Sequence, residues 1–186
     1  MSIFDNFSYG DDDSMIDESV IEGYEKLIDL LELNPKVTTT LKKCVHNPYA
    51  YYRKHKKYYE ERGFEDEEDI DEEEIIWIGI VDTLIENKMV FEFDWKTDLE
   101  TFRYGMGILC EKFGLTIEDQ ELNEKDNLTV WAKILNERFL EKGYVIAAMD
   151  IESDSYCVFL TTKSKYDQLV DAADEAEHRI DLAQKM

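Results

Sequence analysis

The sequence has few cysteines, and this shortage excludes one class of protein. Cys44, Cys110 and Cys157 are odd in number and far apart, whereas small secreted domains held by disulfides carry an even, dense set. We therefore expect buried free thiols and a reducing compartment, the cytoplasm.

Long apolar runs are also missing. The longest, Ile75 to Val81, is far shorter than the roughly 18–20 residues that a membrane helix needs. Residues 1–22 contain no Lys or Arg, and a secretory leader begins with basic residues. We expect neither a membrane span nor a signal peptide.

Basic residues are scarce, with 21 Lys and Arg against 44 Asp and Glu, which gives a net charge of −23. This charge opposes non-specific contact with nucleic acid and with anionic membranes, and it favours basic protein partners. The cations that are present concentrate in residues 42–62, which hold seven Lys and Arg against two acids.

The length of 186 residues and the apolar fraction of 44% suit one domain with a real core. Residues 1–17 have the composition of an acidic tail, part of which can be disordered. Residues 18–186 are expected to form a single α+β domain.

The first half of the chain is predicted to be rich in helices. Asn34-Pro35 and Asn47-Pro48 each stop one helix and start the next. The apolar run at 75–81 is ambiguous between strand and helix, and its spacing and acidic lead favour a helix. Helices are predicted at about 19–33, 35–46, 48–62, 68–87, 97–113, 127–142 and 164–177.

Three helix starts carry capping signals. Ser19 with Glu22 and Thr97 with Glu100 have the spacing of capping boxes. Ser164 is expected to cap the last helix.

Strands are predicted in the second half, at about 89–93, 144–151 and 156–162, with a weaker signal at 178–182. The turn at residues 152–155 predicts an antiparallel hairpin. The fold class is therefore α+β, with a small antiparallel or mixed sheet packed with helices.

Motifs for metals and nucleotides are incomplete. His46, His55 and His178 are scattered, and no phosphate loop or dinucleotide fingerprint occurs. We expect no cofactor. Asp150, Glu152 and Asp154 alternate like the start of a calcium loop. The later positions of a calcium-binding loop are not matched in this sequence, so we favour the interpretation that these three acids form the tip of a β-hairpin. A weak divalent site, and with it a metal-dependent hydrolase, stays an alternative.

An acidic run of nine acids in ten residues covers 65–74. It fits a solvated helix start or an interface for a basic protein. The turn at Asp94 and Trp95 is the second candidate contact, although capping with Trp95 as a packing anchor is favoured there. The candidate interaction residues are Glu67, Glu68, Asp69, Asp71, Glu72, Glu73, Glu74, Asp94 and Trp95.

Residues 49–59 interleave tyrosines with cations. Rings and cations together can bind nucleic acid, which makes Arg53, Lys54, Lys56 and Lys57 an alternative basic patch. Pairing of these cations with the protein's own acids is the favoured interpretation, so nucleic acid is an unlikely partner.

Two stretches resemble a known family. One extends from Ile76-Trp77 to Asp94-Trp95-Lys96, and the other includes Asp154-Ser155-Tyr156 and His178-Arg179-Ile180. Over residues 75–182 the chain resembles an uncharacterised family of small acidic bacterial domains of unknown function. The resemblance leaves out residues 1–65, and it implies no reaction.

Many small acidic bacterial proteins are immunity proteins that neutralise a toxin by binding it. By this association, we expect a protein-binding module that acts as an immunity-like inhibitor or adaptor towards a basic partner.

Overall fold

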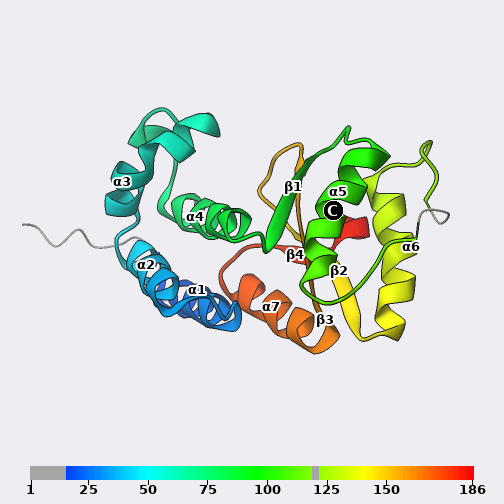
Figure 1. The fold of residues 1–186 in the computed structure, drawn as a ribbon. Helices are drawn as coiled ribbons and strands as arrows, with labels where there is room; N and C mark the ends of the chain where they lie inside the picture. Colours follow the sequence, from blue (N-terminus) through cyan, green and yellow to red (C-terminus); the bar gives the residue numbers. More distant parts are fainter. Residues whose placement is uncertain (1–15, 119–121) are drawn as a thin grey trace, which may run out of the picture.

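The computed structural model describes residues 16–118 and 122–186 (Figure 1). Four helices fill the first half, and the strands follow, mixed with three more helices. The α-helices of this part of the chain are α1 (Glu18–Leu30), α2 (Pro35–His46), α3 (Pro48–Glu61), α4 (Glu72–Glu86), α5 (Leu99–Glu111), α6 (Leu128–Glu141) and α7 (Lys163–Glu175). Two short 3-10 helices are η1 (Glu67–Asp69) and η2 (Ala183–Lys185).

One antiparallel sheet forms the centre, with strand order β1-β3-β2-β4. Its strands are β1 (Val90–Asp94), β2 (Tyr144–Met149), β3 (Ser155–Thr162) and β4 (Ile180–Leu182). The predicted hairpin is β2–β3, and the weakly predicted fourth strand is present. The α+β prediction is confirmed, and the sheet is antiparallel, not mixed.

Both faces of the sheet are covered. Ile146 and Ala148 point into one buried cluster, and their neighbours Ala147 and Met149 point into another, as expected from the alternation of side chains along a strand. Helices α5 and α6 supply the first cluster, and α1 to α4 and α7 supply the second. The sheet is therefore a central layer between helices (Figure 1).

Helix α4 contains the ambiguous apolar run. Every residue from Ile75 to Val81 is buried, because α2, α3 and β1 all pack around this helix. A helix that is apolar on all sides is typical of a core position. This explains why the apolar residues of the run show no clear helical or strand periodicity. Asp71 caps the helix by accepting the Glu74 N–H at 2.8 Å.

Three predicted caps are wrong by one or two positions. Helix α1 begins after Asp17, which places Ser19 inside the helix. Asp98, one residue beyond Thr97, accepts the Thr101 N–H at 2.7 Å. Thr162, two residues before Ser164, caps α7. Acids and hydroxyl residues cap similarly well, so adjacent candidates could not be separated from the pattern.

Helices α1 and α7 touch closely, although more than a hundred residues separate them in the chain. Gly23 allows the approach: a Cβ at this position would lie 2.6 Å from the Ala176 backbone nitrogen. No real Cβ tolerates that distance, and backbone atoms cannot swing away. The first helix is therefore fitted directly to a late segment of the chain.

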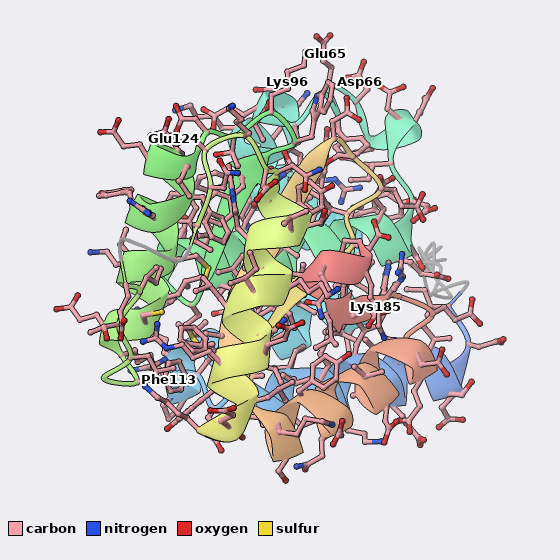
Figure 2. The ribbon with its side chains drawn as sticks, turned by 90° about the vertical axis from the view of Figure 1, so that its right-hand side faces the viewer. Glu65, Asp66, Lys96, Phe113, Glu124 and Lys185 are labelled. Carbon is pink, nitrogen blue, oxygen red and sulfur yellow. The ribbon has the colours of Figure 1, made fainter. Side chains whose placement is uncertain are left out.

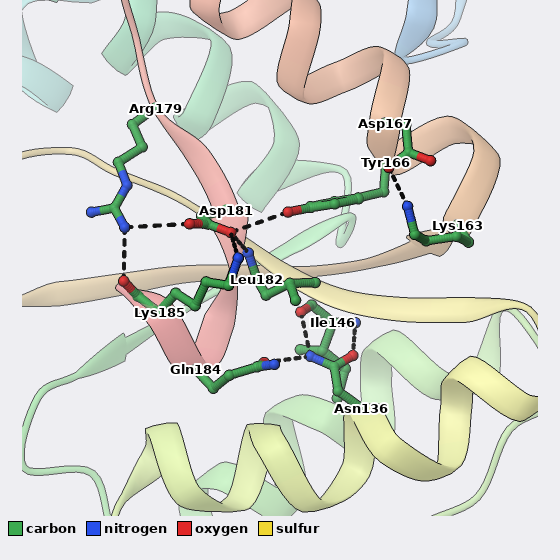
Figure 3. A network of polar contacts seen from close by, with 10 residues as sticks. All are labelled: Asn136, Ile146, Lys163, Tyr166, Asp167, Arg179, Asp181, Leu182, Gln184 and Lys185. Atoms are coloured by element: carbon green, nitrogen blue, oxygen red, sulfur yellow. Dashed lines mark hydrogen bonds and ion pairs between the residues drawn. The ribbon is translucent and has the colours of Figure 1, made fainter.

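Asn136 joins α6 to the sheet (Figure 3). Its Oδ1 accepts the Ile146 N–H at 2.6 Å, and its Nδ2 donates to the Ile146 carbonyl at 2.8 Å. Strand β4 pairs with β2 only as far as Ala147, opposite Leu182. The buried amide therefore takes the place of a strand partner for Ile146.

All three cysteines are free and buried, as predicted. Within the described ranges, no helix combines the length and the apolar character that a membrane crossing demands. The predicted tail at 1–17 lies almost entirely outside these ranges. Its penultimate residue, Ile16, is buried against the helical core.

Candidate functional site

Acids from three segments gather around the first turn of α4. Like charge on Asp71 and Glu152 adds to the effect of burial in raising the pKa of Glu74. Burial, and then Glu177 and Asp71, raise the pKa of Glu73. The α4 start, the β2–β3 turn and the α7–β4 turn thus place several carboxylates close together.

The β1–α5 turn extends this surface. The Trp95 N–H donates to the Asp154 carbonyl at 2.9 Å, and Asp94 pairs in register with Ser155. The Asp94 carboxylate accepts the Lys96 N–H at 2.7 Å, which fixes the turn. We define the acidic face as Asp71, Glu73, Glu74, Asp94, Trp95, Glu152, Asp154 and Glu177.

Trp95 is not the packing anchor that the sequence favoured. Its side chain is 53% exposed, with the Lys96 ammonium 4.4 Å from the ring centroid. The turn leads straight from β1 into the Asp98 cap of α5, and it leaves about half of the Trp95 side chain open to solvent. A large exposed indole among acids suits a contact residue more than a core residue.

An aromatic cluster of Tyr24, Trp77 and His178 lies in the interior next to the acidic face. His178 stacks on Trp77 at 4.2 Å between ring centroids, and its Nε2 lies 2.6 Å from the Tyr24 hydroxyl. That hydroxyl donates to the Glu73 carbonyl at 3.0 Å, and the Trp77 indole N–H donates to the Asp150 carbonyl at 2.5 Å. Two segments of the face are thereby held by one cluster.

Burial lowers the pKa of His178 to about 4, so the imidazole is neutral at pH 7 and does not offset the acids above it. Nothing in the sequence predicts this cluster, because Tyr24, Trp77 and His178 are three polar aromatic residues at distant positions. Only the packing of α1, α4 and the α7–β4 turn brings them together.

The rest of the acidic run has other contacts. Glu67 on η1 receives both the Nε and Nη2 of Arg53, at 2.7 and 2.8 Å. Asp66 lies 3.8 Å from the Lys56 ammonium, and Asp69 accepts the Asp66 N–H. The run is therefore divided: Asp66 and Glu67 lie against cations of α3, whereas Asp71, Glu73 and Glu74 belong to the acidic face.

Figure 2 shows the first half of the run at the same end of the molecule as the β1–α5 turn, with Glu65, Asp66 and Lys96 together at the top of the view. Glu68 and Glu72 belong to the same acidic segment, and Glu72 contributes to the charge around Glu73.

The basic segment of α3 largely pairs with the protein's own acids, as favoured from the sequence. Besides the contacts of Arg53, Lys56 lies 3.7 Å from Glu60 and Lys57 lies 3.5 Å from Glu61. Lys54 is exposed beside α2.

The tyrosines of the same segment mostly face inward. Tyr52 and Tyr59 are buried, and Tyr59 donates to the Ile75 carbonyl at 2.8 Å. Tyr49 and Tyr51 are half-buried against the same core and Tyr58 is exposed, so most of the rings that could stack on bases are taken up by the core beside α4.

The three candidate metal ligands do not form one site. Asp150 accepts the Glu152 N–H at 3.0 Å and lies 3.6 Å from Arg179, while Asp154 contributes its carbonyl to the Trp95 turn. Among residues 16–118 and 122–186, no group of three or more His, Cys, Asp or Glu is arranged to hold a metal ion.

We expect Glu177→Gln to stabilise the protein at pH 7, by about 0.3–1 kcal/mol. Glu177 follows the carboxyl end of α7, where a negative charge opposes the helix dipole, and it also repels Glu73. Because Glu73 has a raised pKa in the folded state, its ionisation costs stability as pH rises.

The gain from Glu177→Gln should therefore shrink as the pH is lowered, because Glu73, whose pKa is raised, then loses the charge that Glu177 repels. Urea denaturation at pH 7 and pH 4 measures both values. Glu137→Gln, an exposed change within α6, is the control and should alter stability little. A gain for Glu177→Gln that persists unchanged at pH 4 would contradict the role of charge.

Comparison with known proteins places the chain in one family. A model of a domain of unknown function, DUF6630, matches residues 23–183. No curated protein and no solved structure gave a match. The match begins well before residue 65, so the expectation that the first third of the chain lies outside the family resemblance is wrong. It includes the basic segment 49–59, and it covers every residue of the acidic face. The protein belongs to the DUF6630 family.

Proposed function

We propose that the protein is a binding module whose acidic face receives a basic partner protein. One observation carries the proposal: carboxylates from the α4 start, the β2–β3 turn and the α7–β4 turn gather at the first turn of α4, where burial and then these neighbouring acids raise the pKa values of Glu73 and Glu74. These acids repel one another at neutral pH, and a cationic partner would relieve that repulsion. The ion pairs of Glu67 and Asp66 show that the protein neutralises acids elsewhere with its own cations.

Trp95 supports the same surface. Interfaces draw much of their affinity from a few aromatic or Arg anchors surrounded by polar residues, and the exposed indole has Asp94 beside it and Asp154 hydrogen-bonded to its backbone. The net charge of −23 would speed the encounter with a cationic protein, in a way that salt weakens.

The role that we propose is an immunity-like inhibitor or adaptor in the bacterial cytoplasm. A binding role requires no catalytic group, and the acidic face consists of carboxylates and one indole beside the hydrogen-bonded cluster of Tyr24, Trp77 and His178. Three buried free thiols suit a reducing compartment.

The test is a pull-down with tagged protein from native extract, at low and high salt, read by mass spectrometry. We expect one stoichiometric basic protein that salt releases. Glu74→Lys with Glu152→Lys should reduce its capture at least about tenfold, which is about 1.4 kcal/mol. Trp95→Ala should also weaken capture, because it removes the anchor.

A matched control makes the experiment specific to this face. Glu137→Lys with Glu141→Lys changes the net charge equally on the exposed side of α6 and should leave capture intact. If both double variants lose the partner equally, only net charge matters and the acidic face is not the interface. If neither loses it, the proposal is wrong.

A further inference from the structure

A second site lies where the N-terminal helices meet the sheet. A pocket of about 360 Å³ opens there, within the range of sites that hold small molecules. Its wall is mainly apolar and comes from α1, α4, α5, β3 and α7. Leu27, Leu84, Leu109, Phe113, Phe159 and Leu169 are among the lining residues.

The pocket lies away from the acidic face. Its β1 contact is Val90, at the opposite end of the strand from Asp94. Figure 2 shows Phe113 in the lower part of the molecule, far from Lys96 at the upper end.

The mouth of the pocket is basic in an otherwise acidic protein. Lys88 from the α4–β1 turn, Lys112 from the end of α5 and Lys165 from the first turn of α7 all line it. The chain has only 21 Lys and Arg against 44 acids, so three cations from three separate segments at one apolar opening are an unusual local excess.

The mouth already holds one carboxylate, that of Glu32. Its Oε2 lies 2.8 Å from the Lys165 ammonium. The hydrogen bond and charge of Lys165, together with the charge of Lys112, lower the pKa of Glu32. Glu32 reaches this position just after α1 through a left-handed backbone, with φ of 52°. The lysines are thus placed to receive a single carboxylate above an apolar cavity.

We propose that this pocket binds a small monocarboxylate with an apolar tail, of the medium-chain fatty acid class. The tail enters the cavity between Leu27, Leu109 and Phe159. The carboxylate replaces that of Glu32 between Lys112 and Lys165. Glu32 then acts as an internal competitor, which gives the proposal a test with a distinctive sign.

Isothermal titration calorimetry with hexanoate, octanoate and decanoate, below the concentrations at which they form micelles, measures the site directly. Each added methylene should tighten binding about fourfold, which corresponds to about 0.8 kcal/mol of burial, until the pocket is full. Octanol, which has the same tail without the charge, should bind more weakly than octanoate.

Two substitutions at exposed positions should change the affinity for octanoate in opposite directions. Glu32→Gln should tighten octanoate binding several-fold, because the competing carboxylate is gone. Lys112→Gln should weaken it several-fold. Glu137→Gln, with the same charge change as Glu32→Gln but on α6, should have no effect.

The outcomes are decisive. Absence of octanoate and decanoate binding to both the wild type and Glu32→Gln would overturn the proposal. Equal affinity for octanol and octanoate, or no response to either substitution, would overturn the assignment of the lysines. None of these variants changes the acidic face, so this result and that of the pull-down are independent.

Discussion

Replacing Asn136 with Leu should lower the free energy of unfolding by about 2–6 kcal/mol. The substitution leaves the Ile146 N–H and carbonyl without the amide that now pairs with both, and each unsatisfied buried polar group costs about 1–3 kcal/mol. Leu has a similar volume, so cavity formation contributes little. Urea denaturation, followed by circular dichroism, measures the loss.

The variant Asn136→Asp distinguishes the hydrogen bond that the Asn136 side chain accepts from the one that it donates. An aspartate can still accept the Ile146 N–H, but an ionised carboxylate would face the Ile146 carbonyl and the Gln184 side chain that now accept from Nδ2. We expect a loss that becomes smaller at low pH, where the protonated acid can donate. A loss below about 1 kcal/mol for Asn136→Leu would mean that the amide does not serve as a strand partner.

Arg62→Met should destabilise the protein by about 2–4 kcal/mol, somewhat less than the loss from breaking a fully buried ion pair. Arg62 follows α3, and its guanidinium contacts Asp82 of α4 at 2.5 Å and Glu92 of β1 at 3.0 Å. Its side chain is 17% exposed. Without it, two carboxylates face each other in a poorly hydrated position.

The pH dependence of Arg62→Met has a defined sign. Burial raises the pKa of Asp82 even beside Arg62, and loss of the guanidinium should raise it further. A folded-state pKa above the unfolded value means that stability increases as pH falls. The variant should therefore recover part of its loss between pH 7 and pH 5 in urea denaturation.

A compensating variant tests whether charge causes the loss. Arg62→Met combined with Asp82→Asn and Glu92→Gln removes all three charges, and it should recover most of the stability at pH 7. Failure to recover would indicate that the loss comes from the packing of the Arg62 stem.

The order of elements could be predicted because the local signals agree with the fold. Asn34 and Asn47, each before a proline, mark the boundaries of α1, α2 and α3, and both side chains cap the helix that follows. The continuous apolar run at residues 144–149 reflects a strand that is covered on both faces of the sheet. Caps were misplaced where several good capping residues lie within two positions of one another, as at Thr97 and Asp98.

The site could be predicted only in part. The acidic run was visible in the sequence, but its division between η1 and α4 depends on which acids Arg53 and Lys56 reach. Trp95 was named as a candidate contact, but the sequence favoured it as a packing anchor beside a helix cap, and its exposure depends on the path of one turn.

The apolar pocket was not predicted at all. Lys88, Lys112 and Lys165 are distant in sequence, and no spacing rule connects them. Only the closure of the sheet against α1, α5 and α7 places them at one opening.

The close contact of α1 with α7 has a consequence for biosynthesis. A chain emerging from the ribosome exposes α1 to α4 early, but the backbone against which Gly23 fits at Ala176 is made much later. Until then, apolar residues such as Leu27 and Ile28, which the folded protein buries, lack part of their cover. Proteins whose early segments must wait for late ones expose aggregation-prone surface during synthesis. The nascent first half is therefore where a holding chaperone would bind.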